Sequence, residues 1–162
     1  NSAIRASLVP ECPRLTFYCF KFHYSHELIE SSGRFCLHLL HEDQVNIVRT
    51  LGFESGRDTE KLGDLRTDQT EFGLPRIENA AAYFDCRIIN AMDAGPSTFF
   101  LGEVEDSGRN PSLDSEDLLQ AEQLRDKLPE SMQEKYRKNK KSVQETARKN
   151  LSVDPEYCWD RK

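Results

Sequence analysis

The sequence predicts a mainly β fold with some α-helix, in which a Greek-key-like antiparallel barrel is followed by a helical C-terminal extension. Short apolar stretches alternate with turn residues from residue 1 to about residue 107. Two long stretches, residues 81–92 and 97–105, flank Ala94-Gly95-Pro96, a sequence typical of a hairpin turn. From Gly108 onward the chain is highly charged and rich in helix-forming residues. We therefore expect a barrel domain over residues 1–107 and a helical extension over residues 108–162.

Local patterns place two more strands with a helix between them. Residues 15–22 (LTFYCFKF) and residues 34–40 (RFCLHLL) are apolar and aromatic, as strands are. Residues 25–33 (SHELIESSG) predict a short helix, with Ser25 as its N-cap and Gly33 as its C-terminal stop.

A second helix is predicted over residues 42–52 (EDQVNIVRTLG). Val45, Val48 and Leu51 recur there at helical spacing, and Gly52 ends the pattern. The next segment, through residue 65, is rich in turn residues, and we expect one short helical piece within it.

The C-terminal region carries a sparse apolar stripe that is interrupted by Pro129. Such a stripe suits a helix that lies on a barrel or on a partner subunit. The basic run KYRKNKK (residues 135–141) is flanked by acidic residues, which favours a solvated helix face over a nucleic-acid patch. We therefore expect the tail to stabilise the protein rather than to form its site. The stripe consists of Leu118, Leu119, Leu124, Met132, Tyr136, Val143 and Ala147.

Composition excludes two classes of function. With 22 basic and 28 acidic residues, the chain lacks the basic excess of a general nucleic-acid binder. Its apolar runs are also much shorter than the roughly 20 residues that a membrane-spanning helix needs. We expect neither nucleic acid nor membrane as a partner.

The cysteine pattern favours reduced thiols and hence a cytoplasmic location. The five cysteines are odd in number and never occur in C-x-x-C spacing. Three of them lie within apolar strands and are expected to fill the core. The four histidines are at positions 23, 26, 38 and 41. His23 and His26 are three residues apart at a strand–helix junction, but spacing places no carboxylate or thiol partner beside them, so we predict no metal site. The cysteines are Cys12, Cys19, Cys36, Cys86 and Cys158, and the expected core residues are Cys19, Cys36 and Cys86.

Phosphate-binding side chains gather where the strand at residues 15–22 ends and the next helix begins. Lys21, Tyr24, Ser25 and His26 all lie at this junction. A helix N-terminus presents unpaired N–H groups and a partial positive charge, so it can hold an anion. The residues alone leave two interpretations open, a phosphate site and a simple helix cap.

The order of these elements resembles the flavin reductase-like family, whose fold is an FMN-binding split β-barrel. The resemblance rests on ASLVPECPRLTFYCFKFHYSHELIESSGRFCLHLLHEDQ, on FESGRDTEKL, and on the later pair YFDCRII and FFLGEVED. It covers residues 1–106, and the helical tail is similar to C-terminal extensions that some members carry. A first barrel strand usually precedes the small-residue segment in this family, so we expect that residues before Asn1 are lacking.

The resemblance implies a binding site for FMN. The phosphate and ribityl chain would lie at the strand–helix turn, held by Lys21 and Ser25 with Tyr24 and His26 in support. The flavin ring would lie along the preceding strand, where small side chains permit close approach of the backbone. The residues expected to line the ring or the phosphate are Ser2, Ala3, Arg5, Ala6 and Ser7.

The implied activity is hydride transfer from NAD(P)H to flavin. The flavin supplies the difficult chemistry, so the family needs no obligatory acid–base residue and we assign no catalytic residue. The resemblance also implies a homodimer with flavin near the subunit interface, and it allows an electron-acceptor protein as a partner.

One departure from the family favours an alternative function. Many members carry an Asp-His pair after the hairpin glycine, whereas this chain has Gly95-Pro96-Ser97-Thr98. His38 also stands where asparagine is common. The alternative is an FMN-binding electron-transfer or sensing module without NAD(P)H turnover. A third interpretation is a structural split-barrel dimer that has lost its flavin.

Overall fold

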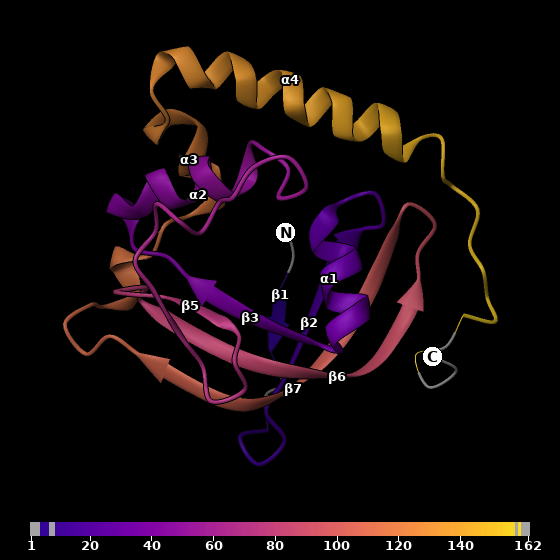
Figure 1. The fold of residues 1–162 in the computed structure, drawn as a ribbon, viewed down its shortest axis with the longest axis horizontal. Helices are drawn as coiled ribbons and strands as arrows, with labels where there is room; N and C mark the ends of the chain where they lie inside the picture. Colours follow the sequence, from indigo (N-terminus) through magenta and orange to yellow (C-terminus); the bar gives the residue numbers. More distant parts are fainter. Residues whose placement is uncertain (1–3, 7–8, 158, 160–162) are drawn as a thin grey trace.

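Five antiparallel strands form one curled sheet, a half-barrel (Figure 1). The computed structural model describes residues 4–6, 9–157 and 159. In the sheet the strand order is β1-β2-β7-β6-β3, so β2 and β3, although near in sequence, lie on opposite sides of the β6–β7 hairpin. This arrangement confirms the predicted antiparallel barrel. The strands are β1 (Ile4–Ala6), β2 (Arg14–Phe20), β3 (Arg34–Leu39), β6 (Ala82–Asp93) and β7 (Ser97–Arg109).

The remaining elements lie around this sheet. Helix α1 (Tyr24–Ser32) connects β2 to β3, and a small hairpin follows α2. Helix α4 runs along the side of the molecule away from the sheet, with α1 and α2 between them in the view of Figure 1. The other elements are η1 (Glu42–Gln44), α2 (Val45–Gly52), β4 (Thr67–Gln69), β5 (Pro75–Ile77), η2 (Ser115–Asp117), α3 (Ala121–Lys127) and α4 (Glu130–Ala147).

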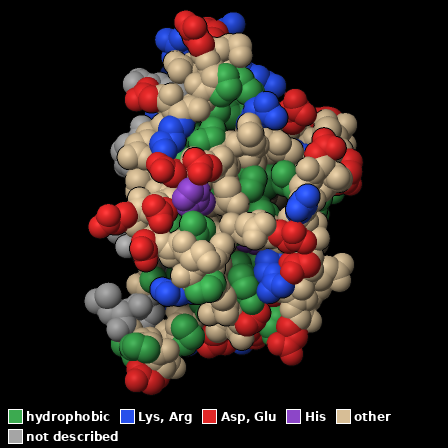
Figure 2. Space-filling view, turned by 90° about the vertical axis from the view of Figure 1, so that its left-hand side faces the viewer, with side chains coloured by type: hydrophobic (Ala, Val, Ile, Leu, Met, Phe, Trp, Pro, Cys, Tyr) green, Lys and Arg blue, Asp and Glu red, His purple; other side chains and the backbone are tan. Residues whose placement is uncertain are grey.

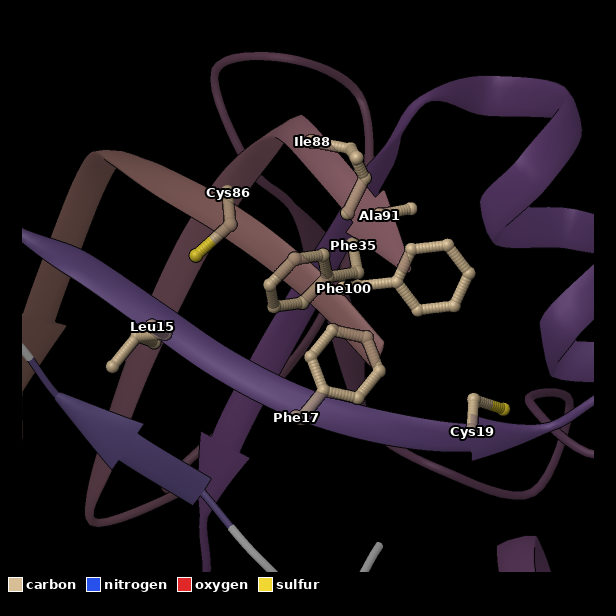
Figure 3. Packing of buried hydrophobic residues seen from close by; sticks show 8 residues of the cluster. All are labelled: Leu15, Phe17, Cys19, Phe35, Cys86, Ile88, Ala91 and Phe100. Atoms are coloured by element: carbon tan, nitrogen blue, oxygen red, sulfur yellow. The ribbon is translucent and has the colours of Figure 1, made fainter. Parts of the chain in front are cut away.

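Aromatic rings fill the concave side of the sheet. Because side chains alternate along a strand, Leu15, Phe17 and Cys19 of β2 all point into the core. The Phe17 ring lies 4.5 Å from that of Phe35 and 5.5 Å from that of Phe100, measured between centroids. Figure 3 shows the eight buried residues of this cluster, which are Leu15, Phe17, Cys19, Phe35, Cys86, Ile88, Ala91 and Phe100.

Two glycines are required by this packing. Gly33 has a φ of +68° and ends α1 in the left-handed conformation, as the sequence predicts. At Gly102 of β7, an added Cβ would lie 2.6 Å from the Phe35 ring. The strand can therefore pass under this ring only where it has no side chain.

The tail packs on its own chain. Leu128, just before α4, is 2% exposed. The Tyr136 ring of α4 lies 6.0 Å from the Phe53 ring, measured between centroids, and Lys135 pairs with Glu54. Part of the stripe predicted to need covering is thus covered within the chain. On the face of the molecule seen in Figure 2, acidic and basic side chains are interspersed, and no single-sign basic face appears there.

Three local predictions are wrong, and one hairpin was not predicted. Helix α1 begins at Tyr24 with His23 as its N-cap, so Ser25 lies inside the first turn. The N-cap residue makes no side-chain hydrogen bond, so the preference of serine for N-cap positions could not locate the start of this helix. Residues 53–66 form turns and bends rather than a short helix. The β4–β5 hairpin was not foreseen, because three-residue strands leave too short a pattern to recognise. The tail is not helical to its end, since α4 stops at Ala147.

Replacing Phe100 tests the core. Phe100 is 1% exposed and contacts Phe17, so we expect Phe100→Ala to lower the free energy of unfolding by about 3–5 kcal/mol. Phe72 is 40% exposed and lies over Arg34, so Phe72→Ala should cost about 1 kcal/mol or less. Urea unfolding of both variants measures the difference. Similar losses in the two would contradict this assignment of the core.

Candidate functional site

The turn after β2 is fastened to the β6–β7 turn. The Lys21 amide donates a hydrogen bond to the Pro96 carbonyl, at 3.0 Å. The Lys21 ammonium lies 2.7 Å from the Asp93 carboxylate, which is only 7% exposed. Lys21 is therefore held in place at the end of its strand by two contacts with the neighbouring hairpin.

Asp93 is the acceptor that gathers these segments. Its Oδ1 accepts hydrogen bonds from Lys21 and from the Gly95 amide, the latter at 2.7 Å. Its Oδ2 accepts from the Asp154 amide at 3.1 Å. Burial by itself raises the pKa of Asp93, but the hydrogen bonds from Lys21, Asp154 and Gly95 outweigh it and lower that pKa below its usual 3.8. Asp93 is thus a carboxylate at neutral pH.

A hollow of about 290 Å³ lies beside Lys21. It is lined by Lys21, Phe22, Gly95, Asn150 and Ser152, so the strand end, the hairpin turn and the C-terminal tail all contribute. An ammonium group has three N–H donors, and Asp93 takes one of those of Lys21. The Lys21 side chain is 36% exposed and can still donate to a bound anion. The sequence did not point to Asn150 and Ser152, because contacts of the tail with this turn join residues far apart in the chain.

The other three residues predicted at this turn do not line the hollow. Ser25 is exposed on the first turn of α1. Tyr24 packs against Gly56, with the Arg57 guanidinium 5.2 Å from its ring centroid. His26 is 6% exposed, and its Nε2 lies 2.7 Å from the Thr98 hydroxyl. Of the four, Lys21 is therefore the one that lines the hollow, and the phosphate-binding roles of all four stay predictions.

The N-terminal part of the predicted site is described only at β1. Ser2, Ala3 and Ser7 lie outside the described residues. Arg5 and Ala6 belong to β1 and pair with Thr16 and Leu15 of β2. The predicted contacts of all these residues with a flavin ring remain predictions.

A larger hollow, of about 400 Å³, lies near the other end of the β6–β7 hairpin. Its main cation, Arg76, pairs with Asp68 through two nitrogens and lies 4.8 Å over the Tyr83 ring. The Tyr83 hydroxyl in turn donates to Asp106. Arg76 is held by Asp68 through two nitrogens, whereas Lys21 gives one of its three donors to Asp93, so we take the hollow beside Lys21 as the stronger candidate for a phosphate group.

The cysteines of the core are inert thiols. Burial raises the pKa of Cys19 to about 11 and the pKa values of Cys36 and Cys86 to about 12. Cys19 and Cys86 are core residues as predicted, whereas Cys36 is half-buried and lies 3.6 Å from His38. Cys12 is also a free thiol, and Cys158 lies outside the described residues.

Two kinds of feature are absent from the described residues. No group of three His, Cys, Asp or Glu side chains there is arranged to hold a metal ion. No helix in the described part of the chain has the length and apolar character to cross a membrane.

Comparison with known proteins identifies the family. Residues 1–127 match the family model of the flavin reductase like domain. The chain belongs to this family. The resemblance drawn from the sequence is therefore confirmed, and the matched region continues past β7 into α3.

Individual members of the family show how far the likeness extends. The chain is 32% identical over 114 residues to the flavin-dependent monooxygenase reductase subunit HsaB of Mycobacterium tuberculosis H37Rv, covering 70% of this chain and 59% of HsaB. It is 31% identical over 104 residues to the FMN reductase (NADH) SmoA of Agrobacterium fabrum, covering 64% of this chain and 56% of SmoA. A nitrilotriacetate monooxygenase component B from Mycobacterium thermoresistibile has a similar structure, with a TM-score of 0.62 and 28% identity. That match covers 69% of this chain and 60% of the other. The chain thus spans less than two thirds of the length of these relatives.

Neutralising Asp93 tests its role as the junction of this site. The pKa of Asp93 is lower in the folded protein than the usual 3.8, so the ionised carboxylate stabilises the fold above pH 3.8. This stabilisation is lost as the pH falls through the pKa that Asp93 has in the folded protein. We expect Asp93→Asn to lower the free energy of unfolding at pH 7 by about 1–3 kcal/mol, and the difference to shrink below pH 3.8. Urea unfolding at pH 7, 5 and 3 measures it.

The matched control for this experiment is Asp58→Asn. Asp58 is exposed in a turn, so its replacement should change the free energy of unfolding by about 0.5 kcal/mol or less. A difference between wild type and Asp93→Asn that stays constant down to pH 3 would rule out the ionised carboxylate as its source.

Proposed function

We propose that this protein is a flavin reductase that transfers hydride from NAD(P)H to FMN. The observation that supports the proposal is Lys21, which directly follows β2, lies beside a hollow and keeps donors for a phosphate. The names of two relatives, a monooxygenase reductase subunit and an FMN reductase (NADH), support the same reaction class.

When bound, the flavin supplies the hydride-accepting chemistry. The task of the protein is to bind and orient. Lys21 would hold the phosphate by charge-assisted hydrogen bonds, and Asp93 holds Lys21 in position for it. Ser25, exposed at the start of α1, would add a hydroxyl, and the backbone of β1 would lie along the ring.

The positive charge at this turn comes from Lys21. His23, the nearest histidine, is exposed, but partial desolvation by its surroundings lowers its pKa below the usual 6.5. The charge of Lys61 lowers the pKa of His23 further. His23 is therefore neutral at pH 7, and affinity for a phosphate should depend on Lys21.

A second candidate is an FMN-binding electron-transfer or sensing module without NAD(P)H turnover. It is favoured by the start of β7, where Ser97 is 6% exposed and Thr98 fully buried. The Thr98 hydroxyl is engaged by His26. Within the stretch Gly95-Pro96-Ser97-Thr98, where many members carry an Asp-His pair, Ser97 and Thr98 thus face the interior, and neither offers a side chain to a nicotinamide.

Turnover separates the two candidates. We expect the purified protein to bind FMN, seen as a change in its visible absorbance, and to oxidise NADH or NADPH when FMN and an electron acceptor are present. FMN binding without oxidation of either nicotinamide would favour the second candidate. Failure to bind any flavin would contradict both, and would favour a structural split barrel.

We also propose that the protein is a homodimer. The outer face of the sheet carries an aromatic surface, in which the Tyr18 and Phe99 rings lie 5.8 Å apart. Phe99 is 41% exposed and its cross-strand partner Met92 is 60% exposed. An exposed apolar surface of this kind is typical of a protein interface. Light scattering at micromolar concentration should give twice the chain mass of 18.7 kDa, and a monomer mass would contradict the proposal.

The buried free thiols support a reducing location such as the cytoplasm. An electron-acceptor protein is a further partner that fits a reductase of this kind.

Replacing Lys21 tests the phosphate assignment. Lys21→Ala removes a charge-assisted contact worth about 1.5–3 kcal/mol, so FMN affinity should fall about tenfold or more. Riboflavin has no phosphate, and its affinity should barely change. Equilibrium dialysis of both ligands measures this difference.

The matched control replaces a lysine far from the turn, Lys140→Ala, on the exposed side of α4, and should leave both affinities unchanged. Equal losses of FMN and riboflavin affinity in a folded Lys21→Ala protein would refute the assignment. Ser25→Ala should leave stability nearly unaltered, because Ser25 is not the cap of α1.

A further inference from the structure

The last part of the chain forms a strap across the candidate site. Residues 150–157 and 159, called the strap here, follow α4 and run past the β6–β7 turn on the right-hand side of Figure 1. Over residues 150–157 the strap has neither helix nor strand. It lies beyond residue 127, where the family match ends.

The strap is fixed along its length. An added Cβ on Gly95 would lie 2.8 Å from the Leu151 carbonyl oxygen, so the strap rests directly on the hairpin turn. The Asp154 amide donates to Asp93, at 3.1 Å. The Tyr157 hydroxyl donates to Glu30 of α1 at 2.9 Å. Finally, the Trp159 ring lies 6.2 Å from the Phe100 ring of the core, edge to face.

Because of these contacts, the strap forms one wall of the hollow beside Lys21. Asn150 and Ser152 line the hollow from the strap, and the other lining residues come from the two turns. The Asn150 side chain also donates to the Thr146 carbonyl at the end of α4, at 3.3 Å, which fixes the start of the strap. With the strap in place, the hollow measures about 290 Å³, at the small end of the range for sites that enclose a whole ligand.

We propose that the strap makes this site selective for FMN over FAD. The inference rests on the proposed function, in which Lys21 holds the flavin phosphate. In FMN that phosphate is a terminal monoester, so a small hollow with an ammonium, an amide and a hydroxyl on its walls suits it. In FAD the same phosphate continues through a second phosphate to adenosine, which needs the space that the strap fills.

Charge acts in the same direction. A phosphate monoester carries between one and two negative charges at pH 7, whereas each phosphate of a diester-type linkage carries one. Lys21 therefore attracts the terminal phosphate of FMN more strongly than the corresponding group of FAD. The strap and Lys21 are coupled, because both donate to the same carboxylate, that of Asp93.

A full-length variant with a loosened strap tests this inference. Asp154→Pro removes the N–H that bonds Asp93, and Tyr157→Phe removes the hydroxyl that bonds Glu30, while Lys21 keeps its partner. Val153→Ala is the matched control, since Val153 lies on the strap, is 55% exposed and does not line the hollow. Dissociation constants for FMN, FAD and riboflavin are measured by equilibrium dialysis. Trp159, the single tryptophan of the chain, reports the position of the strap through acrylamide quenching of its fluorescence.

The wild type and Val153→Ala should bind FMN about tenfold or more tightly than FAD. In the Asp154→Pro/Tyr157→Phe variant, quenching of Trp159 fluorescence should rise. The preference for FMN over FAD, measured as the ratio of their affinities, should fall to about threefold or less, chiefly through tighter FAD binding. Riboflavin affinity should stay constant. Equal affinity of the wild type for FMN and FAD overturns the inference while leaving the proposed function intact. An unchanged ratio of FMN to FAD affinity in the double variant also overturns the inference, whether or not Trp159 becomes more accessible. A wild type that binds no flavin at all overturns the proposed function instead.

Discussion

The candidate site depends on one buried carboxylate. Asp93 ends β6, and the three groups that donate to it come from the turn after β2, from its own hairpin turn and from the C-terminal tail. A charge that is 7% exposed would be costly without such donors, since burial disfavours the ionised form. With them, the ionised form is the stable one, and it fixes the positions of three segments that would otherwise meet only through backbone contacts. The positions of Lys21 and of the tail segment beside the hollow thus depend on the same carboxylate.

Asp85 shows what a buried carboxylate is like without this support. It is fully buried on the same strand, and both its oxygens lack a hydrogen-bond partner among the described residues. Its nearest cation, a nitrogen of Arg34, is 3.7 Å away, and Arg34 forms its shorter contact with Glu105, at 2.6 Å. In such a pair the cost of desolvation is only weakly offset by attraction. Of the two buried aspartates of β6, Asp93 is therefore the one whose environment organises a site, and it lies where the strap crosses the hairpin.

The sequence was informative wherever the cause of a structure is local. Apolar alternation located β2, β3, β6 and β7 within a few residues, and Gly33 marked the end of α1 because its φ of +68° disfavours a side chain. The N-cap of α1 was misplaced by two residues, at Ser25, because His23 caps the helix without a side-chain hydrogen bond. Lys21 was found from its place between a strand and a helix. Its partner Asp93, 72 residues away, could not be found, because no local pattern relates the two.

The same limit explains why the tail was expected to stabilise the protein and nothing more. Its composition is that of a solvated helix, and for α4 that description holds, since most of its residues are exposed. The strap, by contrast, acts through backbone groups, the Asp154 amide and the Leu151 carbonyl, which every residue carries and which leave no trace in a sequence pattern. The side chains that do mark this segment, Tyr157 and Trp159, pack against the core cluster formed by the barrel strands. The strap, which follows the part of the chain that matches the family, is thus joined to the core cluster at one end and to the turn beside Lys21 at the other. For that reason a change in the tail can alter which ligand the barrel accepts without altering the barrel itself.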